Sequence, residues 1–313
     1  MKTQHLGSSD QDIKRAVELL ANGGLVALPT ETVYGLGADA LTDQAVAKIY
    51  EAKGRPSFNP LISHMASTEM AGDYAILSDL AEKLVEAFWP GPMTLILPAR
   101  QNCKISKLAR AGLPSVAIRV PAHPIAQALI SALNRPIAAP SANLSGRISP
   151  TTKDHVIADL DGRIDGLIDG GPCTMGVEST IISLIDHPII LRPGHITAED
   201  VATVLGTDVA IEANPKSITA PGQLTSHYAP NAHLRLNAQQ FTPDENSLGF
   251  GTHDGDLNLS PSGDLREASA NLFLMLHELD ARSGNKIAVA PIPDHGLGVA
   301  INDRLSRAAA PRS

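Results

Sequence analysis

Two basic and two small polar residues, widely separated in the sequence, form the pattern with the most chemical content in this chain. Lys53 and Arg55 flank Gly54 in a loop stiffened by proline, and Ser141 and Asn143 lie far downstream. Lysine binds phosphate as a point charge and arginine as a planar fork, while a hydroxyl and an amide add neutral donors. Four such side chains, brought together by the fold, suit a polyphosphate. We therefore predict ATP chemistry, with these four residues as the catalytic set.

A Lys-x-Arg loop on its own is more often a solvated surface turn than a binding site. With the Ser-x-Asn pair downstream, we favour the binding site over the solvated turn. We place the loop at the surface in either case. Replacing Lys53 or Arg55 with alanine is then expected to lower activity about 10²-fold and to change thermal stability little.

The composition is that of a globular protein from a reducing compartment. The chain has 313 residues, of which 43% are hydrophobic, enough for a full core and, by size, for two domains. Residues 1–12 are polar, no apolar run approaches the length of a membrane span, and Cys103 and Cys173 form no C-x-x-C pair. We therefore expect a cytoplasmic protein with neither a membrane anchor nor a zinc site.

The charge balance argues against a role in binding nucleic acids. The formal net charge is -8 and the sequence pI is about 5.7, whereas proteins that grip a nucleic-acid backbone usually carry a basic surface. Aromatic residues make up 3% of the chain and offer few stacking platforms for single strands. No stable nucleic-acid binding is expected, although a non-catalytic RNA-binding module remains the alternative function.

Helices and strands are predicted to alternate through the first two thirds of the chain. Residues 9–22 read as an amphipathic helix capped by Ser9 or Asp10. A strand over 24–29 follows, and the polar segment after it would lie at the strand's carboxyl end, where open α/β sheets bind ligands. A helix over 42–53 carries the Lys-x-Arg loop at its exit. Further strands are predicted over 60–64, 93–98, 115–120, 136–139, 165–169, 178–185 and 188–192, and further helices over 78–88, 123–134, 152–160 and 197–205.

The chain is predicted to fold in three parts. Residues 1–213 form a twisted mixed-sheet α/β catalytic domain. Residues 214–230 read as an interdomain linker, because they hold three prolines and show no apolar periodicity. Residues 231–313 form a second, smaller Rossmann-like α/β domain, with strands near 233–236, 247–250 and 287–291 and helices over 264–281 and 298–309.

A series of ordered motifs resembles a known family. In the first part of the chain they are LPTETVYGL at 28–36, KGRP at 53–56, PLI at 60–62, SVAIRVP at 115–121, APSANLSG at 139–146, EST at 178–180 and LRPG at 191–194. HYAP at 227–230 and GVAINDRL at 298–305 extend the match to the end of the chain. Together they resemble the L-threonylcarbamoyl-AMP synthases in their long, two-domain form. The ordered run is far more specific than any one motif.

The resemblance implies a nucleotidyltransferase that joins L-threonine, bicarbonate and ATP into threonylcarbamoyl-adenylate and pyrophosphate. A separate tRNA threonylcarbamoyl transferase complex would then use this product to modify the adenosine beside the anticodon. Magnesium is expected to accompany ATP, bridging phosphate oxygens and keeping several of its waters. The sequence names no protein ligand for it.

The resemblance also implies roles for individual residues. ATP contacts are expected at Lys53, Arg55, Asn59, Ser115, Ser141, Asn143, Ser149, Arg192 and Tyr228. Threonine contacts are expected at Thr32, His64, Arg119, Ala139 and Ser179. Arg119 suits the carboxylate, because its planar fork makes charge-assisted hydrogen bonds. Tyr228, in the linker, is the candidate for a lid that keeps water from the labile intermediates.

Five of the singled-out residues also have an ordinary structural interpretation. Arg119 alternates with apolar neighbours and could simply face outward from its strand. A lone His64 is more often structural than a substrate contact, and Tyr228 could serve only to pin the two domains together. Glu31 and Glu178 could cap backbone groups rather than act as bases.

A third function shares the motifs of the first domain. Hydrogenase-maturation carbamoyltransferases resemble it there, but they would need an acylphosphatase domain and cysteine-rich zinc segments. The two cysteines of this chain exclude those segments.

Overall fold

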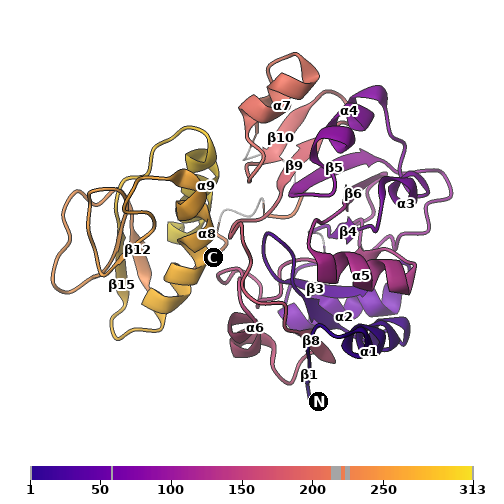
Figure 1. Cartoon of the computed structure of the whole chain (residues 1–313), viewed down its shortest axis with the longest axis horizontal. Coiled ribbons are helices and arrows are strands. Elements are labelled where there is room, and N and C mark those ends of the chain that lie inside the picture. Colours follow the sequence, from indigo (N-terminus) through magenta and orange to yellow (C-terminus); the bar gives the residue numbers. More distant parts are fainter. Residues whose placement is uncertain (1, 58, 213–219, 223–225, 312–313) are drawn as a thin grey trace.

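The computed structural model describes residues 2–57, 59–212, 220–222 and 226–311, which form two α/β domains lying side by side (Figure 1). Within these residues, the larger domain holds an eleven-stranded mixed sheet and the smaller one a four-stranded parallel sheet. The predicted fold class is confirmed. None of the helices in the described part of the chain is both long and apolar enough to cross a membrane.

The large sheet has the strand order β1-β8-β2-β3-β7-β4-β6-β5-β9-β10-β11 in the described chain. At its centre, β6 is parallel to β4 and antiparallel to β5, which is in turn parallel to β9. The carboxyl ends of β4 and β6 therefore share one edge of the sheet with the first residues of β5 and β9. The strands are β1 (Gln4–Leu6), β2 (Val26–Leu28), β3 (Gly35–Asp39), β4 (Ile62–His64), β5 (Met93–Pro98), β6 (Ser115–Arg119), β7 (Ile137–Ala138), β8 (Gly166–Ile168), β9 (Thr180–Ser183), β10 (Ile189–Arg192) and β11 (Ala210–Ile211).

Helices cover both faces of this sheet, because successive residues of a strand point to opposite faces. Val26 and Leu28 belong to the buried cluster that holds residues of α1 and α5 on one face, and Leu25 and Ala27 belong to the larger cluster on the other face, which includes residues of α2, α4 and α6. Ser9 caps α1 with its hydroxyl, as the sequence predicts. The helices are α1 (Asp10–Ala21), α2 (Asp43–Lys53), α3 (Thr68–Gly72), α4 (Asp79–Phe88), α5 (Pro124–Leu133), α6 (Lys153–Leu160) and α7 (Ala198–Leu205).

The core of the smaller domain continues into the larger one. Its strands have the order β12-β15-β13-β14 and pair in parallel throughout the described residues. The apolar stripe of α8 contributes Leu272 and Leu276 to a cluster that also contains Val33 and Val177 of the larger domain. The two domains therefore share a packed interface. The elements are β12 (His233–Arg235), β13 (Asn246–Gly249), β14 (Leu257–Asn258), α8 (Leu265–Asp280), β15 (Lys286–Val289) and α9 (Leu297–Ala309).

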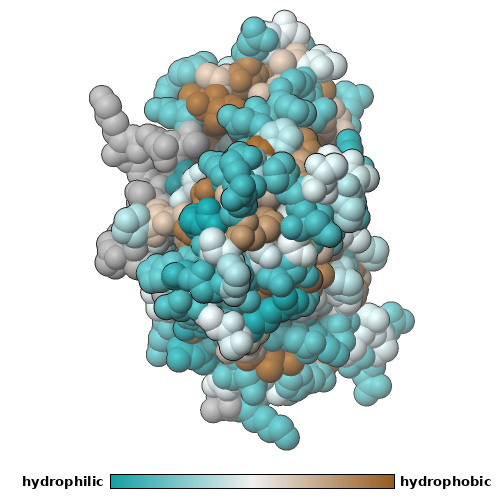
Figure 2. Space-filling view, turned by 90° about the vertical axis from the view of Figure 1, so that its left-hand side faces the viewer, coloured by the Kyte–Doolittle hydropathy of each residue, from teal (hydrophilic) through white to brown (hydrophobic). Residues whose placement is uncertain are grey.

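The opposite side of the smaller domain faces water. Figure 2 shows the molecule from that side, where polar residues dominate and apolar ones are scattered among them. The buried apolar residues of this domain form its own core and the interface with the larger domain.

Five short elements of the described chain carry no clear sequence signal: β1, β3, β11, β14 and α3. In β3, two glycines lower the strand propensity. A Cβ added at Gly37 would lie 2.8 Å from side-chain atoms of Ile137 and Leu28, so close packing between neighbouring strands requires glycine there. The predicted division at residues 213 and 230 stays a prediction, because 213–219 and 223–225 lie outside the described residues.

Candidate active site

A small cavity of about 50 Å³ lies where the central edge of the large sheet meets the linker. The strand order explains the position, since β4 and β6 end where β5 and β9 begin. The cavity is lined by all five predicted threonine contacts and by four of the predicted ATP contacts: Thr32, His64, Arg119, Ala139 and Ser179, and Arg55, Ser141, Arg192 and Tyr228. The fold thus brings residues of eight of the nine motifs to one place.

The other five predicted ATP contacts do not line this cavity: Lys53, Asn59, Ser115, Asn143 and Ser149. Lys53 and Ser149 lie directly behind the wall, because each is hydrogen-bonded to a residue that lines it. Ser115 begins β6, whereas Arg119 ends it. The length of the strand therefore separates Ser115 from the amino-acid contacts.

Lys53 is buried, which corrects the prediction of a surface loop. Its side chain is 2% exposed, and its Nζ donates to the carbonyl oxygen of Ser141 at 2.6 Å and to that of Asn143. Burial, followed by the nearby charge of Arg55, lowers the pKa of this amine well below its usual value. The ammonium group holds the 141–143 turn in place, a role that the spacing of the motifs could not reveal.

Arg55 and Asn59 carry hydrogen-bonding groups without partners among the described residues. Arg55 donates from Nη2 to the carbonyl of Pro60 at 3.2 Å, while its Nε and both amide atoms of Asn59 have no such contact. Burial lowers the pKa of Arg55 to about 10. Buried polar groups are normally paired, so the unpaired Nε of Arg55, a residue that lines the cavity, suits a charged, oxygen-rich ligand.

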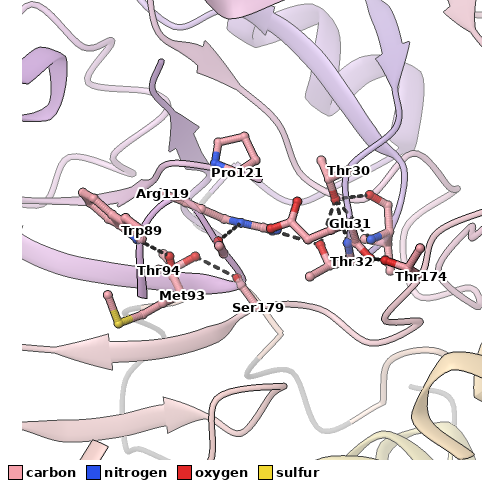
Figure 3. Close-up of polar contacts among 12 residues, drawn as sticks. Thr30, Glu31, Thr32, Trp89, Met93, Thr94, Arg119, Pro121, Thr174 and Ser179 are labelled. Atoms are coloured by element: carbon pink, nitrogen blue, oxygen red, sulfur yellow. Dashed lines mark hydrogen bonds and ion pairs between the residues drawn. The ribbon is translucent and has the colours of Figure 1, made fainter. Parts of the chain in front are cut away.

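Arg119 points into the site rather than away from the sheet (Figure 3). It is 3% exposed, and its guanidinium donates to Glu31 Oε1 at 2.5 Å, Thr32 Oγ1 at 2.9 Å and the Gly91 carbonyl at 3.1 Å. Burial raises the pKa of Glu31, but the charge of Arg119 together with the hydrogen bonds to the carboxylate outweighs burial, and the net shift of the pKa is downward. Glu31 is therefore the counter-ion of Arg119 rather than a free base.

His64 is a buried, neutral histidine in the wall of the cavity. The register of β4 and β6 places it beside Arg119. Burial, followed by the positive charge of Arg119, lowers the pKa of His64 to about 3. Its Nδ1 has no partner among the described residues. A neutral imidazole with one ring nitrogen unpaired can bind a polar substrate group without adding charge.

Ser179 forms hydrogen bonds with Arg192 and with Thr94. Arg192 donates from Nε and Nη2 to its carbonyl oxygen at 3.1 and 2.9 Å, and from Nη2 to its hydroxyl at 3.1 Å. The hydroxyl of Thr94 lies 2.7 Å from that of Ser179 (Figure 3). No predicted motif includes Thr94, and only the pairing of β5 with β6 and β9 identifies it.

Tyr228 both lines the cavity and packs against the smaller domain, which are the two positions considered for it from the sequence. Its ring lines the cavity and is 1% exposed. On its other side the ring centroid lies 5.5 Å from that of Phe273 in α8 and 5.3 Å from the guanidinium carbon of Arg304 in α9. A linker residue in the wall of the site is thus packed directly on the smaller domain.

Arg304 joins the smaller domain to the wall of the site. Its side chain is fully buried, and its Nε donates to Glu178 Oε2 at 2.8 Å. The other oxygen of Glu178 accepts from Ser149. Burial raises the pKa of Glu178, but the charges of Arg304 and Arg192 together with the hydrogen bonds from Ser149 and Arg304 outweigh burial and lower the pKa overall. The motif at 298–305 contains Arg304, yet nothing in the sequence indicated its partner.

The described residues do not provide a protein-built site for magnesium. None of them forms a group of three or more His, Cys, Asp or Glu side chains able to hold a metal ion. Glu178, which lines the cavity, is already paired with Arg304 and Ser149. Magnesium takes mainly oxygen ligands, which water and a bound nucleotide can supply.

Two family models together match nearly the whole chain. The Sua5/YciO/YrdC model, described as "Telomere recombination", matches residues 18–194. A second model, described as "Threonylcarbamoyl-AMP synthase, C-terminal domain", matches residues 196–310.

Full-length relatives agree with these matches. A Bacillus subtilis protein named threonylcarbamoyl-AMP synthase is 42% identical, over 99% of this chain and 96% of its own. A protein of the same name from Pyrococcus abyssi is 40% identical, over 95% and 93%. A crystal structure of Pyrococcus abyssi Sua5 complexed with L-threonine superposes with a TM-score of 0.90 at 37% identity, covering 99% of this chain and 98% of that one. The chain belongs to the threonylcarbamoyl-AMP synthase family, in its two-domain form.

Proposed function

We propose that this chain makes threonylcarbamoyl-AMP and pyrophosphate from L-threonine, bicarbonate and ATP. The observation that carries the proposal is the shared cavity, in which the predicted amino-acid contacts and the phosphate-binding Arg55 and Arg192 line the same wall. The product would pass to a separate tRNA threonylcarbamoyl transferase complex in the cytoplasm.

The amino-acid end of the site suits threonine. Arg119, already oriented by Glu31 and Thr32, would bind the carboxylate, and a charge-assisted bond of this kind contributes roughly 1.5–3 kcal/mol. Ala139 and Ile62 give the wall a small apolar surface for the methyl group. His64 and Ser179 supply neutral polar groups.

The nucleotide end of the site suits the charge changes of adenylate formation. The amine of threonine combines with bicarbonate to give a carbamate and water, and a carbamate oxygen then attacks the α-phosphorus of ATP as pyrophosphate leaves. Arg55 and Arg192 would stabilise the charge on the phosphates, and Lys53 would hold the turn that presents Ser141. Magnesium bound to the phosphates of ATP would neutralise part of their charge.

Pyrophosphate release should require threonine and bicarbonate together, because the nucleophile exists only after the two have combined. The measurement is the rate of pyrophosphate release with each substrate omitted in turn, with mass spectrometry of the nucleotide product. Release at the full rate without threonine would refute the proposed reaction.

The linker should act as a gate. The cavity of about 50 Å³ is far smaller than the several hundred Å³ of a nucleotide pocket, and Gly222, His227 and Tyr228 occupy one of its walls. These residues must move to admit ATP, and their return would exclude water from the carbamate and the adenylate.

Tyr228→Ala is accordingly expected to release more AMP per molecule of threonylcarbamoyl-AMP, because water reaches the labile product. The ratio of AMP to product, measured by liquid chromatography, tests this. Tyr74→Ala, a tyrosine remote from the cavity lining, serves as the control. An unchanged ratio of AMP to product in Tyr228→Ala would show that the linker only connects the two domains and does not gate the site.

A further inference from the structure

Thr94 is a buried residue on which the geometry of the amino-acid site depends. It is fully buried in β5 and does not line the cavity. The strand register places it opposite Arg119 of β6 and opposite Ile181 of β9. Thr94 therefore stands between the two segments that carry Arg119 and Ser179, as Figure 3 shows.

The hydroxyl of Thr94 belongs to a short chain of hydrogen bonds. Among the described residues its hydrogen-bond partner is the hydroxyl of Ser179, 2.7 Å away. Ser179 Oγ also accepts from Arg192 Nη2 at 3.1 Å. All three side chains are buried. The direction of the Thr94–Ser179 bond decides what Ser179 offers to the cavity.

The count of donors and acceptors gives that direction. If Ser179 donated to Thr94, the proton of Thr94 would be buried without an acceptor, at the cost of its lost hydration. If Thr94 donates, the oxygen of Ser179 accepts from both Thr94 and Arg192. The proton of Ser179 then points into the cavity, where a ligand oxygen can accept it. Only the second arrangement satisfies every group once a ligand is bound.

We propose that Thr94 is a positioning residue that fixes the Ser179 hydroxyl as a donor to an oxygen of the bound amino acid, either its side-chain hydroxyl or its carboxylate. The proposal rests on the proposed function, since it takes L-threonine as the occupant. A fixed donor at Ser179 disfavours the ammonium form of the amino group, which is itself a donor, at this position. It thereby helps to set the orientation in which the amine meets bicarbonate.

Thr94→Val tests the proposal, because valine keeps the branched shape and removes the hydroxyl. We expect the KM for L-threonine to rise about tenfold, as for the loss of one oriented hydrogen bond, with little change in kcat or in the KM for ATP. Thr94→Ser should restore the KM for threonine. A merely structural role predicts instead a fall in kcat and parallel changes in both KM values.

Binding of L-2-aminobutyrate identifies the acceptor, since this analogue has the carboxylate but no hydroxyl. In calorimetric titrations, weaker binding of threonine alone by Thr94→Val would assign the side-chain hydroxyl as acceptor. Equally weakened binding of both ligands would assign the carboxylate. Threonine binding as tight as in the wild-type protein would overturn the proposal. A wild-type protein that binds no threonine would refute the proposed function itself, and the role of Thr94 with it.

Discussion

Arg55→Met should reduce the rate of pyrophosphate release about 10²-fold or more while leaving the midpoint of thermal unfolding nearly unchanged. Arg55 lines the cavity, and within the described part of the chain its hydrogen bond is to the Pro60 carbonyl. Its loss removes a donor aimed at the developing phosphate charge. The same change removes a buried cation that lies near Arg192, which offsets the lost hydrogen bond in the folded protein.

Lys53→Met should lower both the rate and the unfolding midpoint. The ammonium group binds two buried carbonyls, of Ser141 and Asn143, and leaving such groups unpaired costs about 1–3 kcal/mol. Lys48→Met is the matched control, because Lys48 is exposed on the same helix and donates to the Gly23 carbonyl at 2.6 Å. Equal stability losses at positions 53 and 48 would contradict the role assigned to Lys53.

The fold could be predicted from periodicity and turn residues wherever an element is long. The helix at 265–280 and the strand at 93–98 agree with their sequence patterns to within a residue, because each carries a continuous apolar pattern. The strand at 35–39 could not be predicted from its sequence, because its glycines lower the strand propensity. The reason for glycine there is the close packing of strands 26–28 and 137–138, which appears only in the folded structure. Pairing between distant strands leaves little trace in one sequence.

The resemblance predicted nine of the residues that line the cavity, but not how deeply the site is buried. The motifs contain four of the five predicted threonine contacts in the cavity wall, and His64 lies just beyond the PLI motif. They do not tell that Lys53 is enclosed, that Arg119 has Glu31 as its counter-ion, or that Thr94 supports Ser179. Each of these contacts depends on which strands and turns become neighbours in the fold. The spacing of the motifs along the chain does not predict those neighbours.

Arg304 is one of the buried side chains through which the smaller domain reaches the site. Arg304 of α9 touches both Glu178 and the ring of Tyr228, and so connects the outer domain with the wall and the gate of the cavity. The apolar cluster that surrounds this contact includes Val33 and Tyr228 as well as residues of α8. The position of the smaller domain and the geometry of the site should therefore change together.

Arg304→Met is expected to destabilise the protein by about 3–5 kcal/mol, because it leaves the buried carboxylate of Glu178 without its main partner. Pyrophosphate release should fall as well, since Ser149 and Tyr228 lose their support. Arg282→Met is the matched control in the same domain. Arg282 pairs with Glu278 on the exposed face of α8, and such a pair contributes about 0.3–0.5 kcal/mol.

The double variant Arg304→Met/Glu178→Gln separates the lost charge pair from lost packing. If the unpaired carboxylate causes the instability, the second substitution should restore part of the free energy of unfolding. In the wild-type protein the pKa of Glu178 is lowered, so its contribution is present at neutral pH and is lost as the pH falls. In Arg304→Met burial should raise that pKa instead, and the deficit should shrink as the carboxylate becomes protonated. A deficit that is independent of pH and is not reduced by Glu178→Gln would show that Arg304 acts through packing alone.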